Sequence, residues 1–124
     1  MLYLVAALAL GIVAQTPAAS RVPLLRAIWP TYIHLLVVGW LTQLIFGVAY
    51  WMFPRYSPEQ PRGSERLGWA AFVLLNTGLV LRALAEPWHS MTGRAGTALV
   101  ASAALQLLAG LAFVVNTWPR VRER

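Results

Sequence analysis

Hydrophobic residues fill this chain in long segments, and most of the charged residues lie in the short stretches between them. Residues 30–53 form one such segment of 24 residues without a formal charge, with Pro30 at its start and Pro54 directly after it. At about 1.5 Å of rise per residue, a helix of this length extends roughly 36 Å. That length exceeds a hydrocarbon core of about 30 Å, so the segment predicts a transmembrane helix with some tilt.

Three further apolar segments, residues 2–18, 67–88 and 95–118, have lengths suited to membrane helices. Small residues at the end of the first segment resemble a signal-peptide cleavage region, but no arginine or lysine precedes it, so we expect this helix to be retained. The pattern therefore predicts an all-α integral membrane bundle of four transmembrane helices that forms a single domain over residues 1–124.

The arginines are distributed unequally between the two ends of this predicted bundle. The end with both termini and the polar loop 54–66 would carry six of them: Arg55, Arg62, Arg66, Arg120, Arg122 and Arg124. The opposite end would carry three, or four with a deeper one: Arg21, Arg26, Arg94 and Arg82. Since cytoplasmic loops carry the excess of positive charge, we expect a multi-pass protein of the bacterial inner membrane with both termini in the cytoplasm.

The composition narrows the classes of function. With 59% apolar and only 11% charged residues, the chain does not have the composition of a soluble domain. Its net charge of +6 comes from arginines at the ends of apolar segments, which favours contact with lipid headgroups over nucleic acid. The sequence has no phosphate-binding loop, no cysteine and only two histidines, so hydrolytic and nucleotide-driven functions are not expected.

His34 is an ionisable residue inside a predicted membrane helix, about one turn after Pro30. Such residues are rare in membranes and are paired, exposed at the interface or functional. Three interpretations are open: an interfacial histidine bonded to a neighbouring helix, an axial ligand to a haem iron, or a contact to a quinone.

Arg82, Glu86 and His89 follow one another at intervals of four and three residues, which aligns them on one face of the third predicted helix. The simplest interpretation is that Glu86 neutralises Arg82 and that His89 caps the helix. The same face is also suited to holding propionates through the arginine or to moving protons through the acid and the imidazole.

Two stripes of small and polar residues are expected to bring helices close together, with their amides bonded across the gap. One stripe lies on the second helix and the other on the fourth: Gly39, Gln43 and Gly47, and then Ser102, Gln106 and Gly110. Asn76 and Asn116 would extend this polar seam. We expect helix packing to be the main role of both stripes.

Two stretches of the sequence are similar to known proteins. The motif from His34-Leu35 through Gly39-Trp40-Leu41 to Phe53-Pro54-Arg55, together with residues 75–82, resembles small four-helix membrane proteins that look like a fragment of haem-copper oxidase and nitric oxide reductase subunit I. The resemblance covers about half of the chain. His34 matches a motif histidine, whereas Tyr32 and Trp51 stand where such proteins often carry further histidines.

The resemblance implies a membrane subunit of a respiratory or photosynthetic electron-transfer complex. It implies haem b as a cofactor, with His34 as the metal ligand. Because the predicted topology places His34 and His89 near the same face, we expect His89 as the second ligand and Arg82 as a propionate or quinone partner. A quinone near the outer face is the other cofactor considered. We expect a subunit of an oxidoreductase complex rather than a catalyst by itself. The alternative is a non-catalytic accessory subunit that packs against lipid and larger membrane proteins.

Overall fold

The computed structural model describes the whole chain except residues 18–20, 56–57, 59–61 and 123–124. All regular elements of the described residues are helices, in the order α1 (Leu2–Ala14), α2 (Pro23–Ala27), α3 (Trp29–His34), η1 (Leu35–Thr42), α4 (Gln43–Met52), α5 (Glu65–Thr92) and α6 (Gly96–Arg122). The predicted all-helical fold class is therefore confirmed for these residues.

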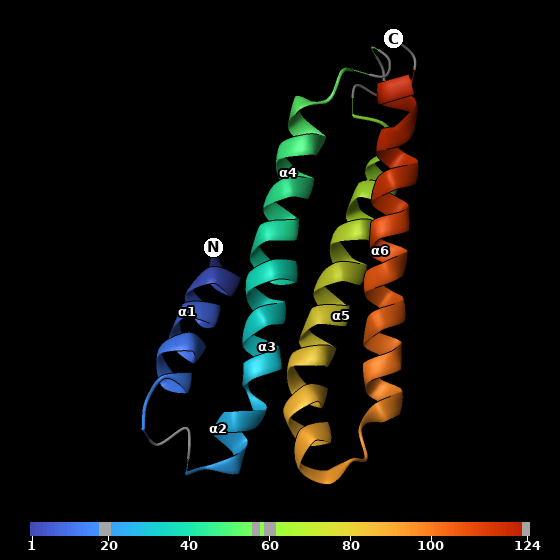
Figure 1. Cartoon of the computed structure of the whole chain (residues 1–124). Helices are drawn as coiled ribbons and strands as arrows, with labels where there is room; N and C mark the ends of the chain where they lie inside the picture. The colour runs from blue at the N-terminus through green and yellow to red at the C-terminus, as the bar shows by residue number, and fades with distance from the viewer. Residues whose placement is uncertain (18–20, 56–57, 59–61, 123–124) are drawn as a thin grey trace.

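The helices form an elongated, mostly antiparallel bundle (Figure 1). The elements α3, η1 and α4 follow one another without a break over Trp29–Met52, and α5 and α6 pack against each other as a long hairpin. One end of the bundle, here named the α2 end, holds α2 and the turn between α5 and α6 (Figure 1). The other, the C-terminal end, holds the end of α4, the start of α5 and the end of α6.

Three helices are long and apolar enough to cross a membrane: Trp29–Met52, Glu65–Thr92 and Gly96–Arg122. The first helix is shorter than predicted, because α1 ends at Ala14 and Gln15 begins a turn. Its 13 residues correspond to about 20 Å of rise, less than the thickness of a hydrocarbon core. It packs beside η1 and α3.

The last two helices continue beyond their predicted ends. The predicted end of the fourth helix at residue 118 is wrong, because α6 runs through Pro119 and continues to Arg122. A proline removes one backbone hydrogen bond, but the turn that contains it is fixed by Arg120, whose guanidinium bonds to the end of α4. Similarly, α5 runs through Pro87 and ends at Gly93, whose φ of 71° is the left-handed conformation of a glycine C-cap.

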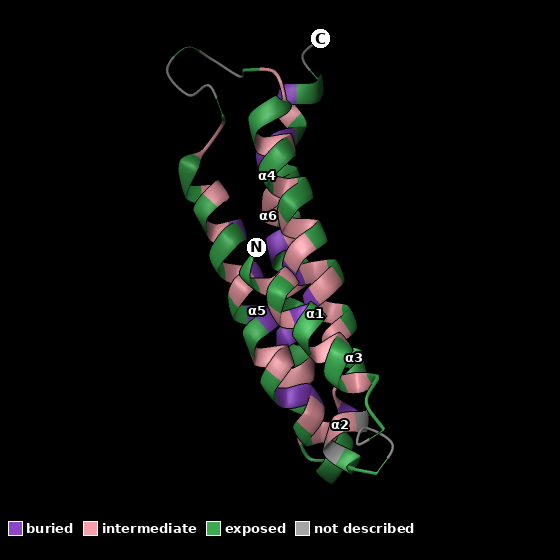
Figure 2. Ribbon diagram, turned by 90° about the vertical axis from the view of Figure 1, so that its left-hand side faces the viewer, coloured by how far each residue is buried: buried purple, intermediate pink, exposed green. Residues whose placement is uncertain are grey.

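The buried apolar core is small and lies where α1, η1 and α5 meet. Ala7, Leu35 and Leu79 are its buried members, and Leu79 is fully inaccessible. Buried residues occupy few turns of the ribbon, whereas exposed positions cover most outer surfaces (Figure 2). Many of these exposed residues are large and apolar, including Val100, Leu107 and Val115 on α6. A surface of this kind is suited to contact with lipid chains.

Glycines set the closest approaches between helices. A Cβ atom added to Gly78 would lie 3.0 Å from the backbone oxygen of Ser102, so α5 and α6 pack backbone to backbone at this point. A Cβ at Gly39 would lie 2.8 Å from a methyl group of Leu79. By contrast, a Cβ at Gly47 or Gly110 would have no neighbour within 4 Å.

The segment η1 is a π-helix inserted in the middle of the first long helix. Within it, the hydroxyl of Thr42 donates a 2.9 Å hydrogen bond to the carbonyl of Val37, five residues earlier. Such wide turns are rare and often lie near functional sites. The segment η1 lies between two polar contacts that the Trp29–Met52 helix makes with α5, one through His34 and one through Gln43.

Candidate functional site

Polar side chains gather at three depths in the bundle. At the α2 end they surround Glu86, in the middle they surround Asn76, and at the C-terminal end they surround Arg120. The cluster around Glu86 contains most of the residues that the sequence suggests as a site, so it is the candidate functional site.

Glu86 is only 8% exposed, although it lies on a helix that is apolar enough to cross a membrane. Its Oε2 accepts a 3.2 Å hydrogen bond from the hydroxyl of Thr31 on α3. Its Oε1 lies 3.5 Å from Nη2 of Arg82, one turn earlier on α5. The expected pairing of Glu86 with Arg82 is thus present, and Thr31 is a partner that the sequence analysis missed. Thr31 and Glu86 are 55 residues apart, and no local pattern relates them.

His34 approaches the same carboxylate from α3, with Nδ1 3.6 Å from Oε2 of Glu86. The same Nδ1 lies 2.9 Å from the carbonyl oxygen of Pro30. A carbonyl oxygen only accepts hydrogen bonds, so Nδ1 must carry the proton of this bond. A neutral His34 therefore has its free electron pair on Nε2, and its ring is partly exposed. This is the state in which an imidazole accepts a proton or binds a metal.

His89, the expected second ligand, lies on α5 three residues after Glu86. A Cβ at Gly96 would lie 3.7 Å from Cε1 of His89, so the ring of His89 lies beside the start of α6. Its Nδ1 is buried and has no hydrogen-bond partner among the described residues. Nε of Arg82 is likewise buried without a hydrogen-bond partner among these residues. Two unsatisfied polar atoms therefore lie close to the turns of α5 that carry Glu86.

The amides in the middle of the bundle pair differently from the expected arrangement. Gln43 donates to Oδ1 of Asn76 over 3.1 Å, and the hydroxyl of Tyr3 donates to the same oxygen over 2.7 Å. Gln106 instead donates to Ser102 on its own helix, and Ser102 donates to the carbonyl of Gly78. Asn76 is thus the acceptor that links α1, α4 and α5.

Arg120 fastens the C-terminal end, although its sequence position suggests only a charged tail. It is 3% exposed and donates three hydrogen bonds of 2.7 to 3.1 Å to the carbonyls of Tyr50, Phe53 and Pro54. These carbonyls lie at the end of α4, where the helix dipole favours a cation. Nη1 of Arg120 has no partner among the described residues.

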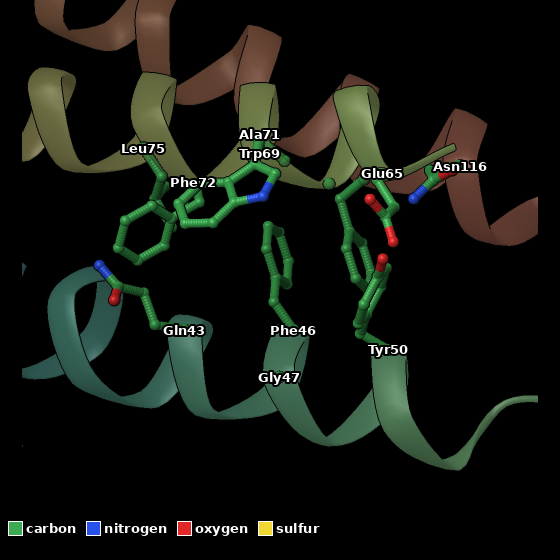
Figure 3. A pocket seen from close by; sticks show the side chains of 12 residues that line it. Gln43, Phe46, Gly47, Tyr50, Glu65, Trp69, Ala71, Phe72, Leu75 and Asn116 are labelled. Atoms are coloured by element: carbon green, nitrogen blue, oxygen red, sulfur yellow. The ribbon is translucent and has the colours of Figure 1, made fainter. Parts of the chain in front are cut away.

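Two cavities adjoin this end of the bundle. The first, here named the α4–α5 groove, has a volume of about 550 Å³ and an apolar lining that includes Phe46, Gly47, Trp69 and Phe72. Figure 3 shows side chains from both helices pointing into this groove. Its inner wall includes Phe113 of α6, whose ring stacks on Phe46 at 3.9 Å between centroids.

The second cavity, here named the arginine pocket, has a volume of about 1190 Å³. Four arginines and one glutamate line it: Arg55, Arg62, Arg66, Arg120 and Glu65. Glu65 also lines the α4–α5 groove, so the two cavities are neighbours. Neither cavity includes His34 or Glu86.

Comparison with known protein families, curated proteins and solved structures gives no match. Within the residues that the structure describes, no group of three or more histidine, cysteine or acidic side chains is placed to hold a metal ion. His34 is therefore considered as a single ligand, together with the residues around Glu86.

Proposed function

We propose that this chain is a membrane subunit of an electron-transfer complex and that His34 and Glu86 exchange protons with a quinone bound at the α2 end. The observation that carries the proposal is the burial of Glu86 on a membrane-type helix, within reach of an imidazole, a hydroxyl and a guanidinium. Intramembrane carboxylates are costly, and they commonly mark proton or substrate pathways.

The arrangement supports a proton-exchanging pair in three ways. His34 presents an unprotonated Nε2 when neutral, because Nδ1 donates to Pro30. Arg82 and Thr31 hold the Glu86 carboxylate in place. The guanidinium of Arg82, beside Glu86, would donate to a quinone carbonyl, and reduction of a quinone needs donors and protons at its oxygens.

Haem b is the other cofactor that the site residues suggest. His34 and Arg82 are the residues that would suit its binding. Nε2 of His34 would be the atom that binds the iron. His89 lies beside Gly96 and would be the second ligand of a haem held by both histidines. Arg82 would be the partner of a propionate. When bound, a haem would supply one-electron transfer.

The membrane placement is also a proposal. We infer that α1 joins the three long helices as a fourth membrane element and that the arginine-rich C-terminal end faces the cytoplasm of a bacterial cell. The support is the excess of arginine at that end, including Arg55, Arg62, Arg66, Arg120 and Arg122. Arg124, also expected at this end, lies outside the described residues.

Quinone binding can be tested with the purified protein in detergent and a soluble quinone such as decyl-ubiquinone. Titration followed by tryptophan fluorescence should give saturable quenching in the native protein. Loss of one of the polar partners of a buried ligand costs about 1.4 kcal/mol or more, so Glu86→Gln should weaken binding about tenfold. Glu65→Gln, at the opposite end, is the control and should bind as the native protein does.

The haem alternative has a separate readout. A reduced-minus-oxidised absorption spectrum of the native protein should show a haem b band that disappears in His34→Ala. A colourless native protein that binds quinone would favour the quinone proposal. A protein that shows neither the spectrum nor the quenching would overturn the electron-transfer assignment.

A non-catalytic accessory subunit is the second candidate, and one observation favours it. A Cβ atom added to Gly47 or Gly110 would meet no other atom within 4 Å, and large apolar residues surround Gly110 on the outer side of α6. Such faces accept another membrane helix as readily as lipid. This candidate predicts that His34→Ala leaves turnover of the host complex unchanged, whereas Gly110→Leu weakens its assembly.

A further inference from the structure

The α4–α5 groove and the arginine pocket together have the chemistry of a phospholipid site. The groove is apolar and lies between two membrane-type helices, whereas the pocket is polar and lies at the end of the same helices. A phospholipid has the same order of parts, with acyl chains in the membrane and a phosphate at its surface. We propose that one anionic phospholipid binds here, with an acyl chain in the groove and its phosphate among the arginines.

The charge of the pocket selects an anionic occupant. Among the described residues that line it, four arginines and one glutamate sum to a formal charge of +3. None of these arginines forms an ion pair with a carboxylate among the described residues, where the two pairs both involve Glu86 at the other end. Unpaired arginines beside a membrane surface attract anionic headgroups by about 1 kcal/mol each.

Arg120 adds a second and independent observation. This residue lines the pocket and is almost fully buried, yet Nη1 has no hydrogen-bond partner among the described residues. Buried cations without a counter-charge are strongly disfavoured. The other nitrogens of Arg120 donate to backbone carbonyls, which do not neutralise its charge. A phosphate in the pocket would supply the missing negative charge.

The walls of the groove suit an acyl chain. Gly47 faces open space, and the aromatic rings of Phe46, Trp69 and Phe72 form flat apolar walls beside it. Tyr50 lies at the passage to the pocket, and the guanidinium carbon of Arg62 is 5.9 Å from the centre of its ring. The occupant would therefore pass Tyr50 at the level where its chain meets its headgroup.

The test uses the full chain purified in detergent, with phosphatidylglycerol as the anionic probe and phosphatidylcholine as the zwitterionic one. Added phosphatidylglycerol should raise the thermal unfolding temperature and should be retained by the protein in native mass spectrometry. Phosphatidylcholine should do neither. Inorganic phosphate, which has no acyl chain, should not reproduce the stabilisation.

Two variants separate the headgroup contact from the chain contact. Arg62→Gln/Arg66→Gln should reduce the affinity for phosphatidylglycerol about tenfold or more, because two headgroup attractions are lost. Its control is Arg21→Gln/Arg94→Gln at the α2 end, which should bind normally. Gly47→Phe should fill the groove and displace the chain, whereas Gly110→Phe, which faces neither cavity, should not.

Equal retention of both phospholipids would overturn the proposal, as would equal losses in the two arginine double variants. Stabilisation by inorganic phosphate alone would reduce the site to an anion site without a lipid. Displacement of bound phosphatidylglycerol by decyl-ubiquinone in the Glu86→Gln protein would assign the groove to a quinone instead. These outcomes do not depend on the proposed function at the α2 end, which involves other residues.

Discussion

Single residues hold this small bundle together at points where few apolar side chains are buried. Asn76 and Arg120 each take part in several hydrogen bonds between helices, and Glu86 combines one such hydrogen bond with two ion pairs. Inside a membrane, water cannot satisfy the polar group that is left when such a bond is lost. The polar contacts are therefore expected to matter more for stability than their number suggests.

Thr31 offers a direct measurement of this effect. Thr31→Val keeps the shape of the side chain but removes the hydroxyl that donates to Glu86. We expect the free energy of unfolding to fall by about 1–2 kcal/mol, because a buried acceptor loses one of its donors. Unfolding in mixed detergent micelles measures the change. Thr97→Val, on an exposed part of α6, is the matched control, and an equal loss there would contradict the role of Thr31.

Some of these side-chain contacts follow from the sequence and others do not. The alignment of Arg82 with Glu86 follows from their spacing on one helix and is present in the structure. The contacts of Thr31 with Glu86 and of Gln43 with Asn76 join different helices. They depend on how the helices are rotated and offset, which the spacing of residues along one helix does not determine.

At the scale of elements, the helices differ in how tightly they pack. The hairpin of α5 and α6 is close, with Gly78 against the backbone of α6. The end of α4 leans away from α5 and leaves the α4–α5 groove between them (Figures 1 and 3). Arg120 and the stacked rings of Phe46 and Phe113 are the contacts that connect α4 to α6 there.

Paired glycine variants test this difference in packing. Gly78→Leu should separate α5 from α6, since even a methyl group would lie 3.0–3.1 Å from three atoms of the facing helix. We expect a loss of about 2 kcal/mol or more in stability, typical of overpacking. Gly110→Leu adds the same side chain to α6 in open space and should leave the stability of the isolated chain unchanged. A comparable loss in both variants would contradict the assigned close approach.

The sequence predicts the existence of the three long helices well, because their apolar runs are long and their polar borders are clear. It places the ends of both proline-containing helices too early, at residues 88 and 118, whereas the helices continue to Thr92 and Arg122. It also contains no recognisable signal for the π-helix of η1, whose hydrogen bonds differ from those of an α-helix only in spacing.

The molecule as a whole presents an apolar outer surface between two ends that differ in their number of arginines. Its orientation can be measured without background labelling, because the chain has no cysteine. Arg55→Cys lies at the C-terminal end and Thr92→Cys at the α2 end, and both positions are exposed. In sealed vesicles, a membrane-impermeant maleimide should label the two from opposite sides, with Arg55→Cys reached from the cytoplasmic side. Labelling of both from one side would contradict the membrane-spanning arrangement.

The π-helix of η1 sets the relative directions in which the two ends of the Trp29–Met52 helix point. Nine positions separate His34 from Gln43, and in an uninterrupted α-helix, which turns about 100° per residue, they would point to opposite sides. A turn closed by bonds to the fifth preceding residue contains one residue more than an α-helical turn, which moves Gln43 back toward the side of His34. Both therefore meet α5, at Asn76 and Glu86. If η1 rewound into an α-helix of the same length, the chain would keep only one of these two contacts.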